Sequence, residues 1–158
     1  MAIIFMDVDG VLNPLFSFTL QEDGYVTITT GWTTWSLNYR LQGKWMKELV
    51  DAGHTIVWCS SWEQDTNIVA QFFKLPELSY VKFNARSTEL KENETWKLKD
   101  IIRYLGDSEE TVFWLDDELE EDAFRWAKYR GNTHLIKCDS SKGWSLEQYE
   151  YMKSILKK

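Results

Sequence analysis

Two aspartates, Asp7 and Asp9, stand two positions apart directly after a short apolar run at the N-terminus. If the extended backbone of that run continues through them, both carboxylates point to the same side. Two negative charges held this close repel each other, and a hard divalent cation with oxygen ligands is the simplest group that offsets the repulsion. A second acidic pair, Asp116 and Asp117, follows a later apolar run. The pattern indicates a Mg2+ site, because magnesium binds through one or two carboxylates and a substrate phosphate.

A cation beside Asp7 would screen the charge of an incoming phosphate, so that the carboxylate can attack phosphorus and form a covalent aspartyl-phosphate. Asp9 would then protonate the leaving oxygen and afterwards deprotonate the water that hydrolyses the intermediate. Phosphoryl transfer depends mainly on positioning and charge neutralisation, so a hydroxyl donor and a cationic side chain should complete the site. Ser60 and Lys97 are the candidates for these two roles.

Two of these candidates have neighbours that compete with them. Ser61 follows Ser60, but Ser60 lies nearer the end of the apolar run before it. Lys99 follows Lys97 by two positions, and residues two apart do not share a helix face, so only one of them can reach the site. Lys97 is favoured because it falls in the first turn of an expected helix.

Six of the seven residues from 116 to 122 are acidic. We expect the first two to serve the metal, and the sequence leaves open whether Asp116 or Asp117 is the direct ligand. The other four are favourable at the N-terminus of a following helix, where the helix dipole stabilises negative charge. Glu121 and Asp122 are the candidates for an additional role at the site.

Alternating strands and helices must position these residues. Apolar runs predict strands at 2–6, 54–59, 80–83, 111–115 and 134–138. Helical spacing predicts helices at 41–52, 68–73, 95–105, around 124–127 and at 145–156. This alternation is typical of an α/β fold, a Rossmann-like three-layer sandwich with a central, mostly parallel five-stranded sheet. In such sheets ligands bind at the carboxyl ends of the strands, where three of the predicted strands end in the polar clusters described above.

The segment from about 14 to 38 differs in composition and is rich in Thr, Phe and Trp. SFTLQ and YVTITT flank EDG at 22–24, which predicts a β-hairpin. About 25 residues are too few for a folded cap domain, so we expect a small hairpin flap and an open site. An open site admits bulky phosphorylated partners such as polynucleotide ends, and it also admits small phosphates.

Several side chains near the flap are candidates for substrate recognition. Four aromatic residues could stack on a base or ring, with core packing as the alternative: Trp32, Trp35, Tyr39 and Trp62. Four basic residues could form an anion-steering patch: Arg40, Lys44, Arg86 and Lys91. His54 and His134 stand at predicted strand starts, away from the catalytic edge, and are interpreted as structural.

Bulk properties limit the classes of function. The chain of 158 residues is 44% hydrophobic and 15% aromatic, which favours a single domain over 1–158. Its net charge of −7 disfavours nonspecific binding to nucleic acid or to an anionic membrane. Cys59 and Cys138 each lie in an apolar run and are expected to be buried free thiols. With only five apolar residues before Asp7 and no basic leader, we expect a cytoplasmic protein with no membrane partner.

Four segments in order resemble the motifs of the haloacid dehalogenase-like (HAD) superfamily. DVDGVLN at 7–13 resembles motif I, and the apolar strand ending in Ser60 resembles motif II. Lys97 within ETWKLKDII resembles motif III, and FWLDDE at 113–118 resembles motif IV. The resemblance covers essentially the whole Rossmann-like core. The patterns WCSSW, WKL, WLDDE and KCDSSKGW are further similar to HAD domains associated with phage and bacterial RNA-repair proteins.

The resemblance implies a role for each motif residue. Asp7 would be the nucleophile, Asp9 the general acid and base, Ser60 the phosphate hydrogen-bond donor and Lys97 the charge stabiliser. Metal contacts would come from Asp7, from the backbone carbonyl of Asp9, and from one residue of the 116–117 pair.

The sequence thus predicts a Mg2+-dependent phosphomonoesterase with an aspartyl-phosphate intermediate, acting on polynucleotide ends or nucleotides. The alternative is a non-catalytic phosphate- or partner-binding module with the same fold, whose hallmark would be loss of Asp7 or Asp9. A receiver-like signalling domain has the acidic pair after its first strand and the phosphorylated aspartate later. The present chain has the opposite order.

Overall fold

The structure is a computed structural model that describes residues 1–15, 24–31, 33–83 and 94–157. Its centre is a five-stranded sheet with the strand order β5-β4-β1-β6-β7, in which all neighbouring strands are parallel. The strands are β1 (Ala2–Met6), β4 (Thr55–Trp58), β5 (Ser79–Tyr80), β6 (Thr111–Asp116) and β7 (Thr133–Lys137). The predicted α/β class with a mostly parallel five-stranded sheet is confirmed.

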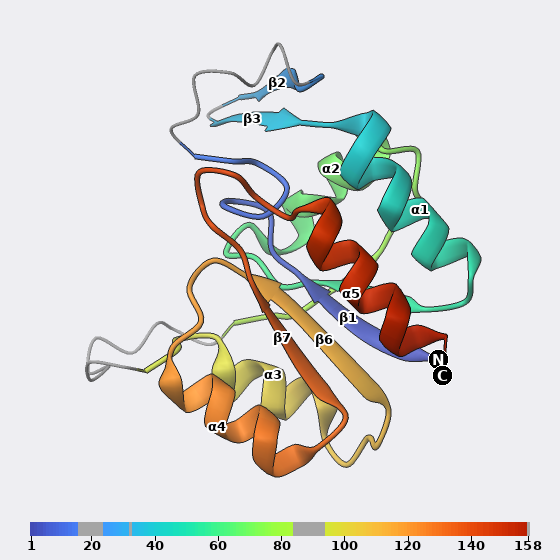
Figure 1. Ribbon diagram of the computed structural model, residues 1–158. Coiled ribbons are helices and arrows are strands. Elements are labelled where there is room, and N and C mark those ends of the chain that lie inside the picture. Colours follow the sequence, from blue (N-terminus) through green and yellow to red (C-terminus); the bar gives the residue numbers. More distant parts are fainter. Residues whose placement is uncertain (16–23, 32, 84–93, 158) are drawn as a thin grey trace.

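Helices cover both faces of this sheet, with α3 and α4 on one face and α1 and α5 on the other (Figure 1). The α-helices are α1 (Lys44–Asp51), α2 (Asn67–Phe72), α3 (Leu98–Leu105), α4 (Glu121–Arg130) and α5 (Leu146–Leu156). A π-helical turn, η1 (Tyr39–Gly43), precedes α1, and a 3-10 turn, η2 (Glu63–Thr66), precedes α2. Among the described residues, no helix has the length and apolar content needed to cross a bilayer.

The continuous apolar run of β1 is explained by its position at the centre of the sheet. Successive side chains of a strand point to opposite faces. Ile4 and Met6 pack in the core on the α1 and α5 face, which also holds Met46 and Met152. Phe5 packs in the second core with residues of α3 and α4. A strand covered on both faces needs apolar residues at every position, not at alternate ones.

Two predicted elements differ from the observed ones. The predicted strand at 80–83 is the two-residue strand β5, Ser79–Tyr80. The helix predicted from residue 95 begins at Leu98, so Lys97 is its N-cap residue and does not lie in the first turn. The cause is Thr95, whose backbone N and Oγ1 both donate hydrogen bonds to the Asp122 carboxylate at 2.9 and 2.7 Å. The start of α4 therefore holds residues 95–97 outside the helix.

A two-stranded antiparallel hairpin consists of β2 (Val26–Thr30) and β3 (Thr33–Leu37). It lies at the opposite end of the sheet from the N-terminus (Figure 1). The predicted hairpin paired YVTITT with residues 17–21, which lie outside the described residues. The described partner of YVTITT is instead the following segment, TTWSL. Two Thr-rich runs separated by only Gly31 and Trp32 are themselves a hairpin signal in the sequence.

The loop after β7 packs against the loop after β1. Trp144 N donates to Val11 O at 2.7 Å, and Leu15 N donates to Ser140 O at 2.6 Å. Gly143 lies between them with φ +75°, and a Cβ at this position would lie 2.5 Å from Val11 O. Only glycine fits both this backbone conformation and this close approach.

We expect Gly143→Ala to destabilise the protein by about 2–4 kcal/mol, from the left-handed backbone and the collision with Val11. Gly131→Ala is the matched control, because Gly131 has the same φ of +75° and nothing within 4 Å of its Cβ position. Urea denaturation of both variants measures the difference. Equal losses of stability in the two variants would show that the close approach of position 143 to Val11 contributes nothing.

Candidate active site

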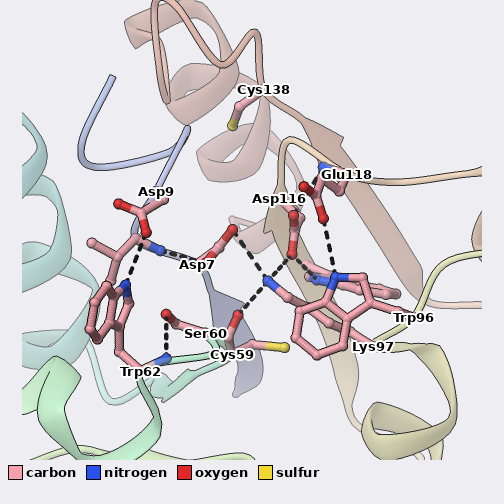
Figure 2. Close-up of polar contacts among 12 residues, drawn as sticks. Asp7, Asp9, Cys59, Ser60, Trp62, Trp96, Lys97, Asp116, Glu118 and Cys138 are labelled. Carbon is pink, nitrogen blue, oxygen red and sulfur yellow. Dashed lines mark hydrogen bonds and ion pairs between the residues drawn. The ribbon is translucent and has the colours of Figure 1, made fainter. Parts of the chain in front are cut away.

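Three neighbouring strands end at the same level and bring the predicted site residues together. Met6, the last residue of β1, is in register with Trp58 of β4 and with Leu115 of β6. The next residues continue this pairing, since Asp7 N donates to Leu115 O at 3.2 Å and Cys59 N donates to Met6 O at 2.8 Å. The side chains that follow the three strands therefore converge on one point (Figure 2).

Lys97 occupies the centre of this site and is only 3% exposed. Its Nζ lies 2.6 Å from Asp116 Oδ2 and 3.2 Å from Asp7 Oδ2, and it donates a hydrogen bond to Cys59 O at 2.9 Å. Burial by itself lowers the pKa of Lys97, but the carboxylates of Asp7 and Asp116 outweigh it and hold the pKa above its ordinary value. The ammonium is therefore charged at neutral pH. Lys99, the competing candidate, is exposed.

The two members of the second acidic pair have different surroundings. Asp116 is fully buried, and its Oδ2 binds Lys97 and accepts from Trp114 Nε1 at 3.3 Å. Its Oδ1 accepts from Glu118 N at 3.0 Å. Asp117 is half-buried and approaches the loop after β1 so closely that a Cβ at Gly10 would collide with its carboxylate. Asp116 is thus committed to protein contacts, whereas Asp117 faces the motif I loop.

The site carries an excess of negative charge. One carboxylate oxygen each from Asp7, Asp116 and Asp117 lies within 4.8 Å of the other two. Burial raises the pKa of Asp7 well above its usual value in spite of Lys97, and burial together with Asp116 raises the pKa of Asp117 to about 7. One ammonium does not balance three carboxylates. An oxygen-rich, negatively charged cluster of this kind fits a hard divalent cation.

Asp9 lies beside this cluster with both carboxylate oxygens engaged. Trp62 Nε1 donates to Oδ2 at 2.9 Å (Figure 2). Asn13 Nδ2 donates to Oδ1 at 2.8 Å. Ser60 is buried, and its Oγ accepts from Trp62 N at 3.2 Å, while Ser61 is exposed. A hydroxyl that accepts one hydrogen bond keeps its own proton for donation. The structure thus brings Ser60, and not Ser61, to the site.

Asp122, a candidate for an additional role at the site, joins the start of α4 to the turn before α3. Its carboxylate accepts from the backbone N and the Oγ1 of Thr95, and Thr95 Oγ1 in turn accepts from Glu120 N at 2.8 Å. These bonds join the start of α4 to the turn that presents Lys97. Asp122 therefore supports the site indirectly. Glu121 lies in the first turn of α4, as expected for a residue that stabilises a helix N-terminus.

The predicted free thiols are confirmed, since Cys59 and Cys138 are both buried and not bonded to each other. Burial is also the largest cause that raises the pKa of each thiol, and the nearby carboxylates add to it at Cys138. Both cysteines therefore stay protonated at neutral pH, which makes them poor nucleophiles.

The structure places the aromatic residues predicted for substrate recognition in different environments. Trp35 is 1% exposed and belongs to the core, so it cannot stack on a substrate. Tyr39 is 40% exposed and packs edge-on against Phe72. Trp32 lies outside the described residues. Trp96 was missed, although it directly precedes Lys97: its Nε1 donates to Glu118 Oε2 at 3.1 Å at the edge of the site (Figure 2).

The predicted basic patch is only partly described. Arg86 and Lys91 lie outside the described residues. Arg40 and Lys44 line a pocket of 390 Å³ with two acidic residues, Glu48 and Asp51. Lys44 pairs with Glu48, and Lys47 pairs with Asp51, so the positive charge there is largely offset. The described part of the patch is therefore a mixed-charge surface.

Comparisons with known proteins give a family match and distant structural likenesses. Residues 3–149 match the family described as the HAD domain in Swiss Army Knife RNA repair proteins. Among solved structures, the chain is similar to a candidate 3-deoxy-D-manno-octulosonate 8-phosphate phosphatase from Vibrio cholerae, at 16% sequence identity and a TM-score of 0.45. That alignment covers 99% of this chain and 83% of the other. No curated protein matches the chain.

We expect Lys97→Met to destabilise the protein by about 3–5 kcal/mol at pH 7, because it leaves buried carboxylates without their counter-charge. Lys99→Met changes the same residue type at an exposed position and should stay within about 0.5 kcal/mol of the parent. Urea denaturation of the two variants measures both values. A similar effect of the two substitutions would contradict the central position of Lys97.

We expect the change in stability caused by Asp117→Asn in the metal-free protein to be more favourable at pH 8 than at pH 4. The pKa of Asp117 is about 7 in the fold and ordinarily 3.8, so the folded state binds the proton more tightly. Its contribution to stability is full below about pH 4 and is lost as pH rises through about 7. Thermal melts with EDTA at both pH values measure the change. A difference that does not vary with pH would exclude this linkage.

Proposed function

The chain belongs to the family of HAD domains found in Swiss Army Knife RNA repair proteins, and from this premise we propose that it is a Mg2+-dependent phosphomonoesterase that uses Asp7 as its nucleophile. The observation that carries the proposal is the buried Lys97 ammonium between Asp7 and Asp116, with Asp117 close enough to complete an anionic cluster. Such a cluster supplies a nucleophile, a positive charge for the phosphate and a place for a cation.

The reaction begins with attack of the Asp7 carboxylate on the phosphorus of the substrate. A bond forms between an Asp7 oxygen and phosphorus, the bond from phosphorus to the ester oxygen breaks, and Asp9 gives that oxygen its proton. Lys97 stabilises the charge on the transferring phosphoryl group, and the Ser60 hydroxyl donates a hydrogen bond to it. The products of this half-reaction are the alcohol and an aspartyl-phosphate on Asp7.

The second half-reaction restores the carboxylate. Asp9, now ionised, takes a proton from water while the water oxygen attacks phosphorus, and the bond from phosphorus to Asp7 breaks. Inorganic phosphate leaves, and Asp9 is again protonated. The same residue serves both steps because the second proton transfer has the reverse direction of the first.

Three groups would hold Mg2+ at this site: the carboxylates of Asp7 and Asp117 and the backbone carbonyl of Asp9. Asp117 is preferred to Asp116 because its half-buried carboxylate faces the loop that carries Asp9, whereas Asp116 is fully buried against Lys97 and Trp114. When bound, the ion supplies charge neutralisation between the Asp7 carboxylate and the incoming phosphate. This assignment explains why Asp117 needs the space beside Gly10.

The substrate class that we propose is a terminal phosphate on a polynucleotide or a nucleotide. Membership of a family named for RNA repair supports this class. The short segment between β1 and α1, which has no room for a folded cap domain, supports access for a bulky substrate. A non-catalytic binding module is the alternative, but Asp7 and Asp9 are both present and both lie at the site.

We expect the protein to hydrolyse p-nitrophenyl phosphate with Mg2+, to lose this activity in EDTA and to regain it when Mg2+ is restored. Asp7→Asn should lower kcat on the order of a thousandfold or more, because it removes the nucleophile. Asp107→Asn, at an exposed carboxylate away from the site, is the control and should retain the parent activity. Magnesium binding without turnover of any phosphate ester would instead support the binding module.

We expect a 3′- or 5′-phosphorylated oligonucleotide to be hydrolysed with a higher kcat/KM than the corresponding mononucleotide. The reason is that an open site lets the remainder of a longer substrate add contacts that a mononucleotide does not make. Phosphate release from the three substrates at equal concentration gives the comparison. A preference for the mononucleotide would move the assignment to small phosphates.

A further inference from the structure

The carboxylate of Asp9 is fixed by two donors that come from different parts of the chain. Asn13 Nδ2 donates to Oδ1 at 2.8 Å, and Trp62 Nε1 donates to Oδ2 at 2.9 Å. Asn13 belongs to the loop after β1, and Trp62 belongs to the turn after β4. One hydrogen bond leaves a carboxylate free to rotate about its own axis, whereas two bonds to different oxygens fix its plane.

Both donors are themselves held by strand β3 of the hairpin. Ser36 N donates to Asn13 Oδ1 at 2.8 Å, so that the amide of Asn13 bridges the hairpin backbone and Asp9. Trp35 packs edge-on against the ring of Trp62, with ring centroids 5.6 Å apart and planes at 88°. Trp35 is fully buried and cannot move independently of its strand. Adjacent residues of β3 therefore reach the same carboxylate by two separate routes.

We propose that the β2–β3 hairpin positions the proton-transfer group of the site, with Asn13 and Trp62 as positioning residues that act through Asp9. This proposal rests on the phosphatase function proposed above. In this role the hairpin sets the direction of the Asp9 carboxylate. An oxygen that accepts a hydrogen bond keeps a second lone pair, at which it can hold or take the proton that moves in the reaction.

If the proposal is right, the loss of activity caused by a misdirected Asp9 depends on the leaving group of the substrate. An alkyl alcohol is a poor leaving group and needs protonation as the ester bond breaks, whereas p-nitrophenolate leaves without it. A misdirected Asp9 should therefore slow the hydrolysis of an alkyl phosphate much more than that of p-nitrophenyl phosphate. A general disturbance of the site would slow both reactions to the same extent.

The test compares kcat/KM for glycerol phosphate and for p-nitrophenyl phosphate, because this quantity reports the first half-reaction. Trp62→Phe keeps an aromatic ring and removes the N–H donor. We expect it to lower kcat/KM on the order of tenfold or more for glycerol phosphate and less than about threefold for p-nitrophenyl phosphate. Tyr129→Phe, which removes a polar group from an aromatic ring that is 93% exposed on α4, is the control and should leave both values unchanged. Equal losses on both substrates would overturn the proposal.

A second measurement does not depend on activity. In protein labelled with 15N at the indole nitrogens, the Trp62 signal is identified by its absence from the Trp62→Phe spectrum. We expect Asp9→Ala to shift this signal, because the N–H loses its acceptor, and Trp35→Leu to shift it as well, because the edge contact is lost. A Trp62 signal that neither substitution moves would refute the link from the hairpin to Asp9.

The two measurements separate the proposals. If the unmodified protein hydrolyses no phosphate ester, the proposed function fails, and the spectra still decide whether the hairpin holds Asp9. If it hydrolyses both esters and Trp62→Phe shows no dependence on the leaving group, the function stands and the role of the hairpin fails.

Discussion

The ion pairs of the buried Lys97 are the interaction on which the site depends. Asp7 directly follows β1, and Asp116 is the last residue of the adjacent strand β6. Both are almost completely buried, and two unpaired negative charges would be strongly disfavoured in such a position. The ammonium contacts both carboxylates and the carbonyl of Cys59, which directly follows β4 on the other side of β1. One positive charge thus joins the ends of three strands and partly offsets the cost of burying the Asp7 and Asp116 carboxylates.

The position of Lys97 depends in turn on contacts that have no catalytic chemistry. The turn before α3 is attached to the start of α4 through Thr95 and Asp122, so the helix starts only after Lys97. If α3 began earlier, Lys97 would be one of several residues on a helical surface and not an N-cap residue aimed at the strand ends. The acidic run from Asp116 to Asp122 therefore has two roles. Its first two residues belong to the anionic cluster, and its last residue, Asp122, holds the turn that presents Lys97.

The sheet and the strand-end residues could be predicted because their signals are local. A strand covered on both faces needs a continuous apolar run, and the first polar residue after the run marks its end, as at Asp7 and Asp116. The hairpin could not be placed, because the Thr-rich segment offers more than one turn signal and pairing depends on which strands meet. The bond from Trp62 to Asp9 and the location of Trp96 depend on tertiary packing, of which a single sequence carries no local trace.

The docking of the 139–144 loop on the loop after β1 has a consequence for the order of folding. The backbone that carries Asp9 and Asn13 is closed by bonds to Ser140 and Trp144, which lie far along the chain and are made long after this loop during synthesis. A nascent chain that has exposed only its first strands on the ribosome would hold Asp7 and Asp9 on an unsupported loop. Contacts between such distant parts of a chain also slow folding. The loop that carries Asp9 should therefore become ordered only after the 139–144 segment has been translated and has left the ribosome.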